Sequence, residues 1–233
     1  MTPKLYAHRG ACREAPENSL EAFQKALDIG VDGIEVDCVL TKDKIPVVTH
    51  YDDLSILKIA LGKVSQKTWN EIKDLGLPSL AQVLELAKPA NVRVVLDIKP
   101  QPGMMFETPC LSAGLAQEML PVERILLSSF YVRHLLTLKK HFAHIKRAAI
   151  LYQNAFRLVP PPFFDKFYGV SALHPFLKWT TKDLVEKWQK KGFEVNVWVP
   201  NTPEAWKRCQ EMGVDGIFTD ESRACKTWLM KKI

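Results

Sequence analysis

The sequence predicts an α/β protein of the TIM (β/α)8 barrel class, built as one domain over residues 1–233. Apolar runs of strand length alternate with segments of helical periodicity along the chain, which is typical of βαβ units and a parallel sheet. Counted generously there are eight strands, enough to close a barrel. The segment Gly30–Ile34 also recurs as Gly213–Ile217, each time after an amphipathic helix and before a strand. This repetition indicates two βα units of one barrel.

Composition argues against several other classes. The net charge is +6, but the basic residues are spread along the chain, so we expect no nucleic-acid partner. The five cysteines are scattered and form no CxxC pair, which argues against disulfides and zinc. No apolar run approaches the roughly 20 residues that span a bilayer, and no leader is recognised at the N-terminus. We therefore expect a cytoplasmic monomer or homodimer without stable membrane insertion.

The first predicted unit is a strand at 5–8 followed by a helix. Asn18 or Ser19 is suited to be the N-cap of that helix. Gly30 is suited to end it in the left-handed conformation. Apolar residues recur at helical spacing between these ends, at Leu20, Phe23, Ala26 and Leu27.

The next strand carries two acids. Side chains alternate along a strand, so Glu35 and Asp37 face one side while Ile34 and Val36 face the other. Burying two carboxylates on one face is costly unless a cation lies between them, and Mg²⁺ or Ca²⁺ suits oxygen ligands. A half-exposed strand with solvated acids explains this stretch equally well when it is taken alone. A short apolar run at 45–50 then ends at His50.

The remaining chain continues the alternation. After a polar loop, we expect helices at 80–87, 112–119, 132–140, 182–191 and 203–212, and a final helix at the C-terminus. The expected strands are 93–97, 124–128, 146–152, 168–172, 194–199 and 215–219. The Pro160–Pro162 stretch, with Phe163 and Phe164, is predicted to be a loop.

Functional residues of a barrel lie where strands end. This topology would place three carboxylates, two histidines and two cations at the same end of the barrel: Glu35, Asp37, Asp97, His8, His50, Arg9 and Lys99. Three carboxylates can hold a divalent metal, Arg and Lys suit phosphate oxygens, and two imidazoles suit acid and base roles. The set predicts metal-assisted cleavage of a phosphodiester.

Other residues receive a structural interpretation. The remaining histidines are assigned to the surface or the core, with His174 in a loop. The Asp97–Lys99 pair could be a solvated ion pair at a strand end. Trp198 is assigned to barrel packing, and Phe163, Phe164 and Phe167 to core or loop anchoring.

The chain resembles the glycerophosphodiester phosphodiesterase family, especially its short bacterial members, over nearly its full length. The early motifs that carry this resemblance are His8-Arg9-Gly10, Pro16 to Ser19, Gly33 to Asp37 and Pro46 to His50. The later ones are Leu96 to Pro100, Leu127 to Phe130, Val197 to Val199 with Asn201, and Gly213 to Asp220. Each is weak alone, and together in order they are specific.

The resemblance implies hydrolysis of glycerophosphodiesters to sn-glycerol 3-phosphate and an alcohol, with Mg²⁺ or Ca²⁺ as cofactor. It implies that His8 and His50 are the acid/base pair and that Arg9 and Lys99 hold the phosphate. It further implies that Glu35, Asp37 and Asp97 bind the metal, and that Trp198 lines the glycerol side.

The chain departs from the family pattern at two positions. Asp97 stands where the family usually has Glu, and Tyr51 separates His50 from Asp52, where the family has Asp directly. Two alternatives follow for the function. One is a lysophospholipase D, for which 160–167 and 228–230 would supply apolar surface; the other is a catalytically silent barrel that binds phosphodiesters.

Overall fold

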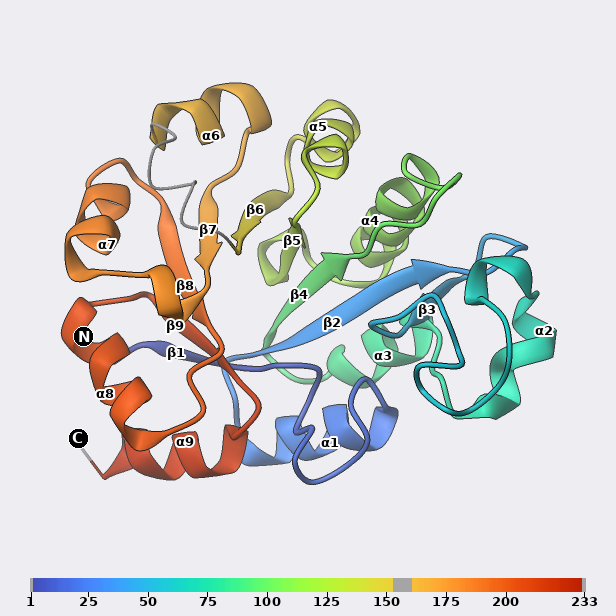
Figure 1. The fold of residues 1–233 in the computed structure, drawn as a ribbon, viewed down its shortest axis with the longest axis horizontal. Helices are drawn as coiled ribbons and strands as arrows, with labels where there is room; N and C mark the ends of the chain where they lie inside the picture. Colours follow the sequence, from blue (N-terminus) through green and yellow to red (C-terminus); the bar gives the residue numbers. More distant parts are fainter. Residues whose placement is uncertain (1, 153–160, 232–233) are drawn as a thin grey trace.

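The computed structural model describes residues 2–152 and 161–231 and confirms a single-domain TIM barrel (Figure 1). β1 pairs with both β9 and β2, so the parallel strands close into a ring. β3 (Pro46–Val48) pairs antiparallel with β2 outside the ring. The barrel strands are β1 (Lys4–Ala7), β2 (Gly33–Leu40), β4 (Arg93–Ile98), β5 (Ile125–Ser129), β6 (Lys146–Leu151), β7 (Ala172–Pro175), β8 (Glu194–Trp198) and β9 (Gly216–Thr219).

Helices surround the barrel, and most of the predicted ones are confirmed (Figure 1). The outer helices are α1 (Leu20–Ile29), α3 (Leu80–Ala87), α4 (Glu107–Met119), α5 (Val132–His141), α6 (Pro161–Tyr168), α7 (Lys182–Gln189), α8 (Pro203–Met212) and α9 (Ser222–Met230). The predicted polar loop after His50 contains the short helix α2 (Trp69–Ile72) and two 3-10 turns. In the described part of the chain, no helix is long and apolar enough to cross a membrane.

The prediction between residues 160 and 175 is wrong in three respects. Helix α6 occupies most of the predicted loop, because prolines are tolerated in the first turn of a helix. The predicted strand at 168–172 is displaced, since Gly169 adopts a left-handed φ of 60° after α6 and β7 starts at Ala172. His174 lies in this strand rather than in a loop. Residue 160 and the side chain of Phe163 lie outside the described part of the chain.

The repeated GVDGI segment performs the same structural task twice. Gly30 and Gly213 end α1 and α8 with φ of 74° and 72°. Asp32 and Asp215 each accept the backbone N–H of a neighbouring strand, at 2.8 Å from Leu5 N and 2.8 Å from Val195 N. A Cβ on the second glycine of either copy would collide with the ring of Tyr6, at 2.6 Å from Gly33 and 2.5 Å from Gly216. The repeat thus provides the space for Tyr6 at the bottom of the barrel.

Side chains at alternate positions of each strand fill the barrel in layers. The bottom layer contains Tyr6 and the ion pair between Arg93 and Glu194, 2.5 Å apart. An apolar layer follows above it, formed by Val95, Leu126, Ala148, Ala172 and Phe218. The next positions along the same faces open into the mouth of the barrel. This alternation places the polar residues of β1, β2 and β4 in one pocket.

Candidate active site

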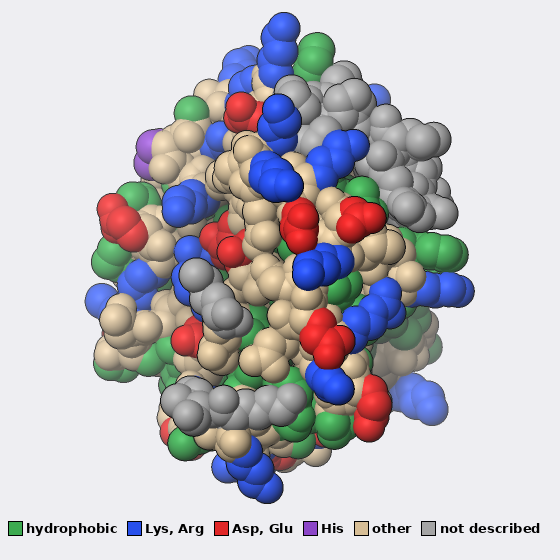
Figure 2. All heavy atoms as spheres, turned by 90° about the vertical axis from the view of Figure 1, so that its left-hand side faces the viewer, with side chains coloured by type: hydrophobic (Ala, Val, Ile, Leu, Met, Phe, Trp, Pro, Cys, Tyr) green, Lys and Arg blue, Asp and Glu red, His purple; other side chains and the backbone are tan. Residues whose placement is uncertain are grey.

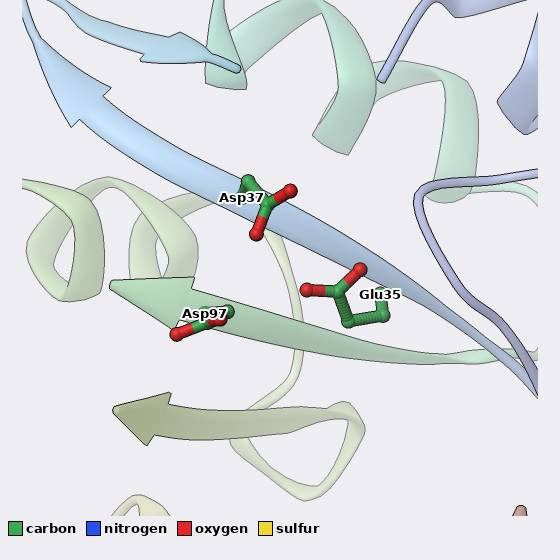
Figure 3. A group of neighbouring side chains, drawn as sticks. All are labelled: Glu35, Asp37 and Asp97. Atoms are coloured by element: carbon green, nitrogen blue, oxygen red, sulfur yellow. The ribbon is translucent and has the colours of Figure 1, made fainter. Parts of the chain in front are cut away.

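Three carboxylates meet on neighbouring strands at the barrel mouth (Figure 3). Glu35 and Asp37 project from β2, and Asp97 projects from β4 at the position that pairs with Asp37. One oxygen from each lies within 4.8 Å of the others, and all three residues are buried. The predicted shared face of Glu35 and Asp37 is therefore confirmed, and Asp97 joins it through the parallel register.

Burial and mutual repulsion disturb the ionisation of these acids. Burial, followed by the charge of Asp37, raises the pKa of Glu35 well above its usual range. Burial also raises the pKa of Asp97, with Lys99 opposing the shift. Burial alone would raise the pKa of Asp37, but Lys99 and Arg9 outweigh it and hold the pKa below its usual range. Glu35 and Asp97 are therefore the two acids whose ionised forms would gain most from a further positive charge nearby.

Two cations and an amide hold the cluster in place. Lys99 Nζ lies 2.7 Å from Asp37 Oδ1 and 2.5 Å from Asp97 Oδ2, so its ammonium bridges the two strands. Arg9 donates its backbone N–H to Glu35 at 2.9 Å, and its Nε lies 3.2 Å from Asp37. Asn18 donates to Asp37 at 2.8 Å from the loop before α1. The two predicted phosphate-binding cations thus lie within contact distance of the predicted metal ligands.

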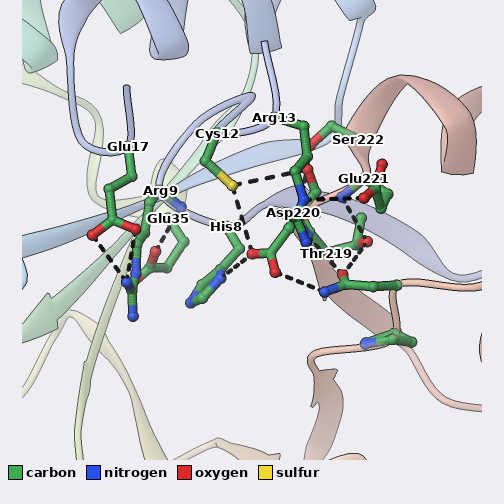
Figure 4. A network of polar contacts seen from close by, with 12 residues as sticks. His8, Arg9, Cys12, Arg13, Glu17, Glu35, Thr219, Asp220, Glu221 and Ser222 are labelled. Atoms are coloured by element: carbon green, nitrogen blue, oxygen red, sulfur yellow. Dashed lines mark hydrogen bonds and ion pairs between the residues drawn. The ribbon is translucent and has the colours of Figure 1, made fainter. Parts of the chain in front are cut away.

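A hydrogen-bonded network orients His8 (Figure 4). Its Nδ1 lies 2.7 Å from Asp220 Oδ1. A carboxylate only accepts, so Nδ1 carries the proton and Nε2 is left for the pocket. Asn201 donates to the other oxygen of Asp220 at 2.7 Å. Burial alone would raise the pKa of Asp220, but the contact with His8 outweighs it and lowers that pKa to about 2, so Asp220 stays ionised.

His50 lines the same pocket from the segment after β3. Burial lowers its pKa to about 4, so the imidazole is neutral near pH 7. Its Nδ1 is buried without a hydrogen-bond partner among the described residues, and its ring meets the edge of Tyr51 at 4.4 Å. Asp52 accepts from Ser65 at 2.7 Å and from Gln101 at 3.0 Å. Asp52 therefore fastens the loop after His50 to the loop after β4.

The mouth encloses a pocket of about 190 Å³. Of the predicted site residues, His8, Arg9, Glu35, His50, Asp97, Lys99 and Trp198 line it. Asp37 is fully buried behind this lining. The opposite wall is aromatic: Trp198 contacts Phe130 edge-on at 5.7 Å and Phe176 at 4.8 Å, and Tyr152 stacks on Trp198 at 5.9 Å. Trp198 thus belongs to a wall of the pocket rather than to barrel packing alone.

Several residues that contact the site residues were not predicted from the sequence. Asn18 was a candidate cap, but Ser19 caps α1 and Asn18 turns inward with φ of 59°. Asp220 and Glu17 were part of recognised motifs without an assigned contact, and Glu17 forms an ion pair with Arg9 at 3.0 Å. His134 is a buried core residue bonded to Ser129 at 3.0 Å, as a structural interpretation predicts.

The described residues fit a hard divalent cation. Three buried carboxylates lie together, burial disfavours the ionised forms of Glu35 and Asp97, and Asp97 Oδ1 has no hydrogen-bond partner among the described residues. Oxygen donors of this type suit Mg²⁺ and Ca²⁺. Such an ion would stabilise the ionised carboxylates and add positive charge beside Arg9 and Lys99, which suits a phosphodiester anion.

A TIM barrel whose mouth joins buried acids, two cations and a histidine pair defines a hydrolase of phosphoric diesters. The profile of the glycerophosphoryl diester phosphodiesterase family matches residues 8–224, and the chain belongs to this family. It is 32% identical to a glycerophosphodiester phosphodiesterase of Caldanaerobacter subterraneus subsp. tengcongensis, with 95% of both chains covered.

Further relatives agree with this assignment. The chain is 28% identical to a human lysophospholipase D over 93% of this chain and 83% of the relative. Its fold is similar to that of an Oleispira antarctica phosphodiesterase solved with the product sn-glycerol-3-phosphate, with a TM-score of 0.89. The two sequences are 22% identical, and the match covers 98% of this chain and 97% of the Oleispira chain. The predicted family, fold and enzyme class are confirmed.

Proposed function

We propose that the protein hydrolyses glycerophosphodiesters, which are deacylated phospholipids, to sn-glycerol 3-phosphate and an alcohol. The observation that carries the proposal is the cluster of three buried carboxyl groups, flanked in one pocket by Arg9, Lys99 and two histidines. Glu35, Asp37 and Asp97 would hold Mg²⁺ or Ca²⁺. When bound, that ion would act as a Lewis acid on a phosphoryl oxygen. The relative from Caldanaerobacter carries the same activity in its name.

Different residues of the site would take different roles in the reaction. Arg9 and Lys99 would attract the non-bridging phosphate oxygens and stabilise the charge that develops on them. One histidine would accept the proton of the attacking oxygen and the other would donate a proton to the departing alkoxide as the P–O bond breaks. Asp220 holds His8 in one orientation for such a transfer. Trp198 would cover the apolar side of the glycerol.

The test is release of sn-glycerol 3-phosphate from glycerophosphocholine and glycerophosphoethanolamine, read by a coupled dehydrogenase. We expect release with Mg²⁺ or Ca²⁺ and its loss with EDTA. Absence of release under every metal condition, with tight ligand binding, would contradict the proposal and support a silent phosphodiester-binding barrel. A cytoplasmic location and a monomeric or homodimeric state stay predictions.

A second candidate is a lysophospholipase D acting on single-chain phospholipids. The human relative bears this name, and a groove of about 330 Å³ beside His50 supports the candidate. Leu57, Ile59, Leu75 and Leu77 give this groove an apolar wall. Turnover of lysophosphatidylcholine at a rate above that of glycerophosphocholine would favour the second candidate.

A further inference from the structure

Exposed apolar side chains are distributed unevenly between the two ends of the barrel. Among the described residues, fifteen large hydrophobic side chains are exposed. Nine of them lie in segments that connect a barrel strand to the helix after it, on the mouth side. The other six lie in helices, and none lies in a described connection from a helix to the next strand. Single exposed apolar residues are normal, but their concentration around one mouth indicates an interaction surface.

The most exposed group lies in residues 54–63, between β3 and α2 (Figure 1), which we call the apolar loop. Leu61 is 83% exposed, Ile56 54% and Ile59 38%. Both ends of the loop are fixed, because Leu54 and Val64 are fully buried in one small cluster. Leu54 N also donates to Gly62 O at 2.9 Å. The aliphatic side chains are therefore presented from an anchored base.

Aromatic residues continue this surface around the mouth. They stand at the end of four successive barrel strands or in the segments beyond, and we call them the aromatic rim: Phe106, Phe130, Tyr131, Tyr152 and Trp179. Phe106 and Tyr152 are each 54% exposed. Aromatic rings of this kind are favoured at the boundary between lipid and water.

Lysines predominate in the apolar loop, and acids flank this surface at Asp53, Glu71 and Glu107. Residues 54–70 include Lys58, Lys63 and Lys67 and no aspartate or glutamate. The segment 172–181 likewise includes Lys178 and no acid. By contrast, the face of the molecule over α7 and α8 mixes both signs (Figure 2), with ion pairs such as Lys182–Glu186. Aliphatic tips with lysines suit an anionic lipid layer, because the ammonium groups reach the head groups while the apolar parts enter.

The apolar loop is connected to the catalytic pocket. Leu57 and Ile59 line the groove beside His50, and His50 also lines the deep pocket that contains the acids. An apolar path therefore leads from the exposed tip of the loop to the predicted acid/base residue. A phosphodiester with one acyl chain would lay its chain along this path while its phosphate reaches Arg9 and Lys99.

We propose that the apolar loop and the aromatic rim form an interfacial surface that docks the barrel mouth on an anionic lipid layer. The surface gives single-chain phosphodiester lipids access to the site, and this substrate assignment rests on the proposed phosphodiesterase activity in the form of its second candidate, the lysophospholipase D. The docking itself does not require turnover, so the two can fail separately.

The test is co-sedimentation of the full chain with vesicles of phosphatidylglycerol and phosphatidylcholine, or of phosphatidylcholine alone. We expect binding to the anionic vesicles that weakens at high salt. Leu61→Asp is expected to reduce the bound fraction about ten-fold, because a charge replaces an inserted aliphatic side chain. The matched control is Met230→Asp on α9, which is 65% exposed, and it is expected to bind like the wild type.

The rate on glycerophosphocholine is measured for the same variants as a check of folding. Leu61→Asp is expected to keep this rate and to lose turnover of lysophospholipid in anionic vesicles. Three results would overturn the proposal: no binding by the wild type, equal binding by Leu61→Asp, or self-association without vesicle binding that Leu61→Asp abolishes. Vesicle binding without turnover of any phosphodiester would leave the docking surface supported and contradict the proposed function instead.

Discussion

The barrel mouth has two halves that differ in chemistry and in the type of contact that holds them. On or just after β9, β1, β2 and β4, polar and ionisable side chains are linked by short contacts, such as His8 to Asp220 at 2.7 Å and Lys99 to Asp37 at 2.7 Å. At the ends of β5 to β8 the positions that face the pocket carry rings, and Trp198 contacts Phe130, Phe176 and Tyr152. A phosphodiester has a charged centre and apolar ester arms, so the two halves match its two parts. We infer that the charged half mainly accelerates the reaction and that the aromatic half mainly binds the substrate.

The largest effects should come from the charged half. We expect His8→Ala and His50→Ala each to lower kcat by about 10²- to 10⁴-fold, the range of general acid–base catalysis. Steady-state kinetics with glycerophosphocholine would measure the loss. His144→Ala, an exposed histidine bonded to Gln117, is the matched control and should retain the wild-type rate. A wild-type kcat in either active-site variant would remove that histidine from its role.

Loss of the hydrogen bond between Asp220 and His8 should have the next largest effect on kcat. Asp220→Asn removes a hydrogen bond to a charged group, worth about 1.5–3 kcal/mol. We expect kcat to fall roughly 10- to 100-fold with KM nearly unchanged. Asp220→Glu, which keeps the charge, should recover part of this loss. A rise in KM alone would show that Asp220 acts on substrate binding instead of on His8.

The aromatic half should respond differently. Replacing Trp198 by Leu removes ring contacts worth about 0.5–1.5 kcal/mol. We expect KM to rise roughly 2- to 10-fold while kcat stays within about two-fold of the wild type. If kcat falls as far as in the histidine variants, the division between the two halves is wrong.

A smaller effect concerns acid stability in the aromatic half. Burial lowers the pKa of His174 to about 3, whereas an unfolded histidine titrates near 6.5. Below about pH 6.5 the unfolded chain therefore binds a proton that the folded chain does not, and stability decreases as the pH falls toward 3. The slope for one such group is at most about 1.4 kcal/mol per pH unit. Urea unfolding at pH 7 and pH 5.5 should show a smaller difference for His174→Gln than for the wild type.

The two halves also differ in how far the sequence predicts them. Glu35, Asp37, Asp97 and Lys99 were placed together because strand alternation and barrel topology decide which side chains share a face. The aromatic wall obeys the same alternation, since Tyr152 and Phe176 stand two residues after Ile150 and His174. Apart from Trp198, which the family resemblance placed on the glycerol side, this wall was not predicted, because the boundaries of β7 were misplaced and an aromatic residue in a strand is equally typical of a core.

Contacts between residues that are far apart in the sequence were the second feature that was not predicted. Asp220 lies 212 residues from His8, and although the predicted barrel brings the ends of its first and last strands to one mouth, no contact was assigned to the residue after the last strand. Asn18 illustrates the same limit at short range, because a cap and an inward-facing amide have the same sequence signal. Alternation within one strand thus predicts which side chains share a face, whereas a specific contact between distant strands requires the side-chain positions of the structure.

The central claim is that the three buried carboxylates hold a divalent cation. The most direct measurement is the melting temperature of the metal-free protein with and without saturating Mg²⁺ or Ca²⁺, for the wild type, Glu35→Gln, Asp97→Asn and His8→Ala. Binding at 100 times Kd contributes about 2.7 kcal/mol, which corresponds to a rise of roughly 5–10 °C for a chain of this size. We predict this rise for the wild type and for His8→Ala, whose imidazole is not a ligand, and its loss in the two carboxylate variants. No shift in the wild type, or an equal shift in the carboxylate variants, would contradict the metal site.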